Sequence, residues 1–176
     1  IGGNIQTHGV NITADSANPD NTIALVVNGL LNTTPGSGGT LTLSGGLSLG
    51  TAPIVGAGNI TLQGNGLDLS LGTLNFSNSV AFSVVRNIIV TGLLSSDVGA
   101  DISLTGDNGN SGVGGVQITS TGAVNSGGNL MLQGSSLSNL SINAGIDIES
   151  GATLTALGNL TLDTNFNGNI IMHGAV

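Results

Sequence analysis

The stretch Gly158-Asn159-Leu160-Thr161-Leu162-Asp163 carries the pattern that decides the fold of this chain. Apolar and polar residues alternate after the Gly-Asn pair, and a period of two is typical of a short β-strand with one buried face. Gly and Asn favour the turn that would precede such a strand. The same phrase returns at 39–43, 58–64, 101–106 and 128–134, with looser copies at 10–13, 67–71, 116–119, 140–143, 146–148 and 168–172.

The spacing of these phrases indicates how the strands are arranged. Ile60 follows Leu41 by 19 positions, and Leu160 follows Leu130 by 30. Short strands at such intervals, joined by tight corners, favour a coil in which each strand stacks on its counterpart one turn later. The sequence therefore predicts a parallel β-helix, or β-solenoid, with Gly/Asn-rich corners. It would span 1–176 as a single domain or as a fragment of a longer repeat array. An antiparallel β-sandwich or jelly roll is the alternative.

The composition agrees with a folded β-protein that has an aliphatic core. Hydrophobic residues make up 39% of the chain and aromatic residues only 2%. Charged residues are 6%, against about 25% in ordinary soluble domains. The polar surface must therefore be built from Asn, Ser, Thr and Gly.

The charge balance excludes several classes of partner. One Arg and no Lys stand against nine acidic residues, which gives a net charge of −8. Nucleic acid is excluded because phosphate binding needs clustered cations. No apolar run approaches the roughly 18 residues of a membrane span, so no membrane insertion is expected. Cysteine is absent, which removes disulfides, thiolate metal sites and cysteine nucleophiles.

Three phrases resemble the repeats of filamentous haemagglutinin-type bacterial exoproteins, and autotransporter passenger domains look similar. These phrases lie at 128–132, 144–148 and 158–162. The resemblance implies a right-handed parallel β-helix that is secreted and displayed as a long shaft, with a role in adhesion or aggregation. The Asn-Pro-Asn signature of that family's secretion domain is missing, and Ala17-Asn18-Pro19-Asp20 is the nearest stretch. We therefore interpret the chain as part of the shaft and not as the secretion domain.

The predicted function is that of a non-catalytic, extracellular shaft or fibre segment of a bacterial surface adhesin. The end of a solenoid exposes unpaired strand edges, to which another copy or a tandem repeat can add. A glycan or a protein on a host or on the cell surface is a further class of partner.

Two alternative functions stay open. One is a carbohydrate-binding, tailspike-like solenoid, against which the absence of Trp and Tyr counts. The other is an ice-binding solenoid, suggested by Thr-x-Thr pairs at 40–42, 119–121 and 153–155.

No residue is predicted to be catalytic. His8 and His173 lie near opposite ends of the chain, where a rod would keep them apart. Arg86 is interpreted as a corner residue paired with a carboxylate. Asp147 and Glu149 alternate with apolar residues, which places both on the outer face. An exposed polar face is the interpretation preferred over a glycosidase pair.

No cofactor is predicted, and calcium is the one ion that two of the loops suggest. Residues 15–21 gather two carboxylates and two amides, and residues 106–110 are similar. Hard cations take such oxygen ligands, so Asp15, Asp20 and Asp107 are the candidate ligands. Local hydrogen bonding in turns is the explanation preferred for the same residues.

Overall fold

The computed structural model describes residues 69–76, 79–84, 86–108, 112–136, 144–165 and 168–176, and before residue 69 only the strands named below. The described residues contain strands, turns and bends but no helix. In that part of the chain, accordingly, no helix is long and apolar enough to cross a membrane.

The strands form four sheets. Sheet I has the order β2-β5-β8-β11-β14-β17-β20 and sheet II the order β3-β6-β9-β12-β15-β18-β21. Sheet III has the order β10-β13-β16-β19 and sheet IV the order β1-β4-β7.

The bounds of the strands are as follows. Sheet I contains β2 (Val10–Thr13), β5 (Leu41–Ser44), β8 (Ile60–Gly64), β11 (Val80–Val84), β14 (Ile102–Thr105), β17 (Leu130–Gly134) and β20 (Leu160–Thr164). Sheet II contains β3 (Leu25–Val27), β6 (Leu47–Leu49), β9 (Leu69–Leu71), β12 (Ile88–Val90), β15 (Val116–Ile118), β18 (Ile146–Ile148) and β21 (Ile170–Met172). Sheet III contains β10 (Leu74–Phe76), β13 (Leu93–Ser96), β16 (Ala123–Ser126) and β19 (Thr153–Ala156), and sheet IV contains β1 (Ile5–Gln6), β4 (Leu31–Asn32) and β7 (Ile54–Val55).

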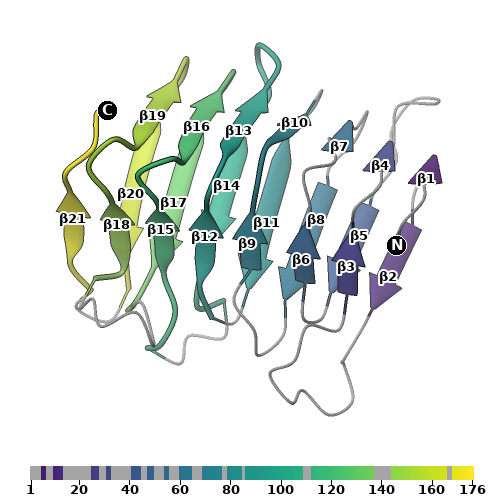
Figure 1. The fold of residues 1–176 in the computed structure, drawn as a ribbon, viewed down its shortest axis with the longest axis horizontal. Helices are drawn as coiled ribbons and strands as arrows, with labels where there is room; N and C mark the ends of the chain where they lie inside the picture. The colour runs from purple at the N-terminus through teal and green to yellow at the C-terminus, as the bar shows by residue number, and fades with distance from the viewer. Residues whose placement is uncertain are drawn as a thin grey trace.

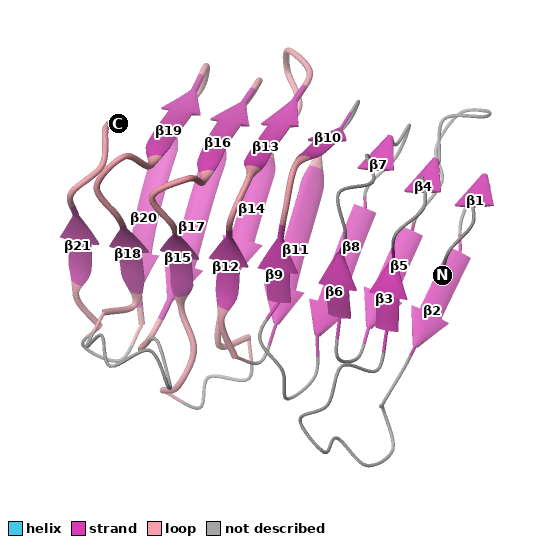
Figure 2. Ribbon diagram, in the orientation of Figure 1, coloured by secondary structure: helices cyan, strands magenta, loops and turns pink. Residues whose placement is uncertain are grey.

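Consecutive strands belong to different sheets, and within each sheet the neighbouring strands are three places apart in the chain (Figures 1 and 2). The strands β7 and β10 are also three places apart, but they belong to separate sheets. We call a set of three consecutive strands from three different sheets, such as β17, β18 and β19, a rung. All pairings between named strands are parallel, for example Leu104 opposite Leu132 and Leu132 opposite Leu162. The described pairings therefore disagree with the antiparallel sandwich that the sequence had left as an alternative.

The phrases predicted as strands from the alternation are strands in the structure. The phrase at 128–134 contains β17, that at 158–163 contains most of β20, and the looser copy at 10–13 is β2. The copy at 140–143 lies outside the described residues.

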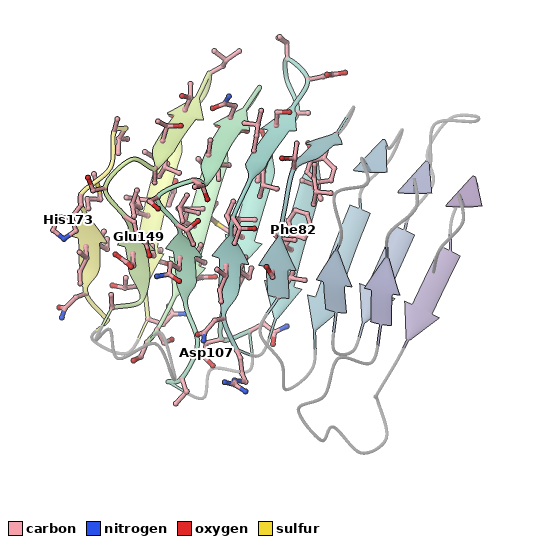
Figure 3. The ribbon with its side chains drawn as sticks, viewed as in Figure 1. Phe82, Asp107, Glu149 and His173 are labelled. Atoms are coloured by element: carbon pink, nitrogen blue, oxygen red, sulfur yellow. The ribbon has the colours of Figure 1, made fainter. Side chains whose placement is uncertain are left out.

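The core consists of aliphatic columns between the sheets. In β17, Leu130 and Leu132 are buried while Met131 and Gln133 are half-buried. Each inward residue lies on its counterpart in the neighbouring rung, and each fully buried aliphatic side chain contributes about 1.5–3 kcal/mol. Phe82 lies inside the molecule (Figure 3), with its ring centroid 5.6 Å from that of Phe76 in an edge-to-face contact.

Candidate functional site: the corner ladder and the C-terminal rung

Asp107, the described calcium candidate, lies in the turn after β14 (Figure 3). Its Oδ2 accepts a hydrogen bond from the Gly112 N–H at 2.8 Å, and its own N–H donates to the Arg86 carbonyl at 3.2 Å. The side chain is buried and the backbone has a φ of 58°. A carboxylate that caps its own loop in this way fits the local hydrogen-bonding role of Asp in turns.

The calcium hypothesis stays a prediction. Asp15 and Asp20 lie outside the described residues. Within the described ranges, no group of three or more His, Asp or Glu side chains is placed to hold a metal ion. A calcium-dependent rise in the melting temperature would support an ion at any of the three candidates.

Asp147 and Glu149 take part in a hydrogen-bonded network that the sequence did not predict. The Gln117 Nε2 donates to Asp147 Oδ2 at 3.2 Å and to Glu149 Oε1 at 2.9 Å, and Glu149 Oε2 accepts the Ser120 N–H at 2.8 Å. Asp147 is only 4% exposed, so the expected exposed polar face is wrong at this residue. The network ties the rung of β15 to that of β18, which is a structural role.

His173 and Arg86 both contact the neighbouring rung through backbone hydrogen bonds. His173 follows β21, close to Glu149 in Figure 3, and its N–H donates to the Ile148 carbonyl at 2.8 Å. Arg86 lies between β11 and β12, as expected for a corner residue. His8 is outside the described residues.

A ladder of side-chain-to-backbone hydrogen bonds runs along one corner, where the chain enters sheet I. The Ser79 Oγ accepts the Asp101 N–H at 2.9 Å. Asp101 Oδ1 accepts the Asn129 N–H at 2.7 Å, and Asn129 Oδ1 accepts the Asn159 N–H at 2.9 Å. We call Ser79, Asp101, Asn129 and Asn159 the corner ladder. Each member directly precedes a strand of sheet I, and the side chains of the first three hold the backbone of the following rung.

The sequence signal for this ladder is a polar residue placed immediately before the first aliphatic residue of each phrase. Taken singly, each such residue looks like an ordinary turn former. Only the stacking shows that these residues hydrogen-bond to one another.

A shallow groove follows the corner ladder across the outer face of sheet I. It encloses about 310 Å³ and spans β14, β17 and β20. Carboxylate, amide and hydroxyl groups face it together with one thioether. Its lining includes Asp101, Ser103, Asn129, Met131, Asn159 and Thr161.

The last rung exposes apolar side chains that are buried in the preceding one. Ile170 is 43% exposed and Met172 46%, whereas their partners Ile146 and Ile148 are both 0% exposed. In sheet I, Leu160 and Leu162 are only partly buried. The cause is geometric, because β20 and β21 are the end strands of their sheets. Among the described residues, no further rung covers the apolar side chains of β20 and β21.

This chain matches no protein-family model, no curated protein and no solved structure.

Proposed function

We propose that this chain is a right-handed parallel β-solenoid that acts as a non-catalytic, extracellular shaft or fibre segment, of the kind that bacterial surface adhesins display, and that it self-associates end to end. The parallel pairing of every third strand and the stacked aliphatic columns support the solenoid form. A stack of this kind grows by adding rungs, so length and rigidity are the properties it provides.

The regular stacking of equivalent strands is the observation that carries the proposal, and the apolar side chains of the rung of β20 and β21 agree with it. Burying one side chain of the size of Ile170 or Met172 contributes about 1.5–3 kcal/mol, and several such side chains lie together at this end. The unpaired edges of β20 and β21 need hydrogen-bond partners of the type that each inner strand already has. A further rung, from the next repeat of a longer chain or from another copy, supplies both requirements at once.

The charge of the chain favours such addition at moderate ionic strength. Lysine, which natural edge strands use to block strand addition, is absent from the whole sequence. In β20 the outward residues are Thr161 and Asp163, and Asp163 accepts a hydrogen bond from Gln133 at 3.0 Å. The net charge of −8 makes copies repel one another, so assembly should increase as salt screens that repulsion.

Electron microscopy of the purified chain tests the proposal. We expect filaments with an axial repeat of about 4.8 Å, the spacing of hydrogen-bonded strands. The variant Met172→Asp places a charge on the exposed last rung and should abolish the filaments. The matched control Val98→Asp changes a residue that is 87% exposed in the turn after β13, and it should leave the filaments intact.

Compact particles that do not assemble at any salt concentration would contradict end-to-end association. Filaments of the Met172→Asp variant indistinguishable from those of the wild type would show that assembly uses a different surface.

The groove on sheet I supports a second candidate function, the binding of carbohydrate. A carboxylate or amide lines the groove once per rung, at Asp101, Asn129 and Asn159, and such regularly spaced polar groups suit a ligand with regularly spaced hydroxyls. Binding on a glycan array that is lost in the Met131→Asp variant would support this function, and an array without binding would remove it. The structure gives less support to the ice-binding alternative. The hydroxyls of Thr119 and Thr121 donate to the carbonyls of Val90 and Thr91, so these protons are not directed to water.

A further inference from the structure

We infer that the groove on the outer face of sheet I binds a linear, neutral oligosaccharide of β-1,4-linked pyranoses, laid along the stacking direction with one sugar on each rung. The inference rests on the carbohydrate-binding function proposed for this groove. It adds to that function the orientation, the linkage and the charge of the ligand. It uses only described residues of β14, β17 and β20 and of the positions directly before these strands.

Two rows of side chains line the groove, and each rung contributes one residue to each row. The first row consists of members of the corner ladder, and the second consists of the outward residues two positions later in each strand. The first row is Asp101, Asn129 and Asn159, and the second is Ser103, Met131 and Thr161. Neighbouring strands of a sheet lie about 4.8 Å apart, so both rows repeat at this interval.

The first row presents polar atoms that the corner ladder does not use. Asp101 and Asn129 each use Oδ1 to accept the backbone N–H of the following rung. The Asp101 Oδ2, the Asn129 Nδ2 and the side-chain amide of Asn159 have no hydrogen-bond partner among the described residues. Acceptors and donors that alternate along one groove suit the hydroxyls of a sugar, each of which both donates and accepts.

The second row is polar at its two ends and apolar in the middle. Ser103 and Thr161 carry hydroxyls without a partner in the described part of the chain, and Met131 lies between them. Ile102 and Leu130 also line the groove, but they are 1% and 0% exposed, so the Met131 thioether is its accessible apolar contact. An unbranched thioether adapts its shape to an apolar surface such as the C–H face of a pyranose.

The spacing of the rungs sets the orientation and the linkage of the ligand. In an extended β-1,4-linked chain each pyranose advances by nearly the same length as one rung, about 4.8 Å. A glycan laid along the stacking direction therefore brings successive sugars to equivalent positions between the two rows. A glycan laid along one strand would meet the polar groups of a single rung only.

The charge of the groove selects a neutral ligand. Asp101 is the one ionisable residue among the described residues that line the groove, and none of them is cationic. The whole chain has one Arg, no Lys and a net charge of −8. A carboxylate on the ligand would be repelled and would find no cation in the groove, so acidic glycans should bind more weakly.

The first experiment is calorimetric titration of the wild-type chain with β-1,4-linked glucose oligosaccharides of one to six units. We expect the affinity to rise about fivefold with each unit up to the third, the value of one hydrogen bond per rung. The matched acidic series carries a carboxylate in place of the C6 hydroxymethyl group and should bind at least about fivefold more weakly at each length. An affinity independent of length would overturn the arrangement of one sugar per rung. Equal or tighter binding of the acidic series would overturn the selection by charge.

The second experiment removes one hydroxyl from either end of the second row. Ser103→Ala and Thr161→Val should each weaken binding of the trisaccharide about fivefold. Each should weaken binding of the disaccharide by no more than about twofold, because the disaccharide can use the two intact rungs. The matched control Thr153→Val removes an exposed threonine hydroxyl from sheet III and should leave both affinities unchanged. Unchanged melting temperatures would confirm that the variants are folded, and equal losses for the two ligands would overturn the placement across the rungs.

The outcomes separate the inference from the proposed function. Binding of other glycans that is lost in Met131→Asp, with no binding of the β-1,4-linked oligosaccharides, overturns the inference and leaves carbohydrate binding intact. A chain that binds no glycan contradicts both.

Discussion

At the scale of single residues, alternation assigns each side chain of a strand to the core or to the surface. Leu132 is completely buried, while its neighbour Met131 points to the outer face and is half-buried. The two residues are adjacent in sequence and similar in size, so they allow the same substitution to be compared on the two faces of β17.

We expect Leu132→Asp to unfold the rungs around β17, because a buried unpaired charge costs several kcal/mol. Met131→Asp should change the free energy of unfolding by no more than about 1 kcal/mol. Urea denaturation followed by circular dichroism measures both. Equal midpoints for Leu132→Asp and the wild type would show that the register of β17 is misassigned.

The corner ladder gives a second residue-scale prediction. Asn129→Ala removes the acceptor of the Asn159 N–H, and we expect a loss of about 0.5–1.5 kcal/mol in the free energy of unfolding. Hydrogen exchange should also be faster at the Asn159 amide. An unchanged exchange rate at that amide would mean that the hydrogen bond does not persist in solution.

At the scale of elements, the corners decide how closely the rungs stack. Gly127, between β16 and β17, donates its N–H to Ser96 Oγ at 3.0 Å and accepts the Gly99 N–H at 2.7 Å. A Cβ atom at Gly127 would clash with the Asp97 carbonyl of the preceding rung. At Gly99 the added atom meets nothing within 4 Å, although the backbone φ of 86° disfavours other residues.

These two glycines should therefore respond differently to substitution by alanine. Gly127→Ala should lower the free energy of unfolding by about 3 kcal/mol, because the backbone must shift to relieve the clash. Gly99→Ala should cost about 1–2 kcal/mol, the strain of a left-handed conformation. Thermal denaturation compares them, and a larger loss at Gly99 would contradict the packing of this corner.

At the scale of the whole molecule, each rung contacts only its neighbours, so stability should vary along the stack. We expect the backbone amides of β20 and β21 to exchange faster than those of β14 and β15 in the unassembled chain, because the end strands have a rung on one side only. Assembly into filaments should then slow exchange in β20. Hydrogen exchange with mass spectrometry measures both states, and uniform protection of all four strands in the unassembled chain would contradict this view.

Alternation and turn residues were enough to predict the all-β class, the strands at the repeated phrases and the inward columns of aliphatic residues, because both act over a few adjacent positions. Only the tertiary structure decided that Asp147 is buried against Gln117 and that Asn129 holds Asn159. These hydrogen bonds join residues 30 positions apart, so they depend on which strands stack. The exposure of Ile170 and Met172 has the same origin, since identical-looking phrases are buried or exposed according to whether another rung covers them.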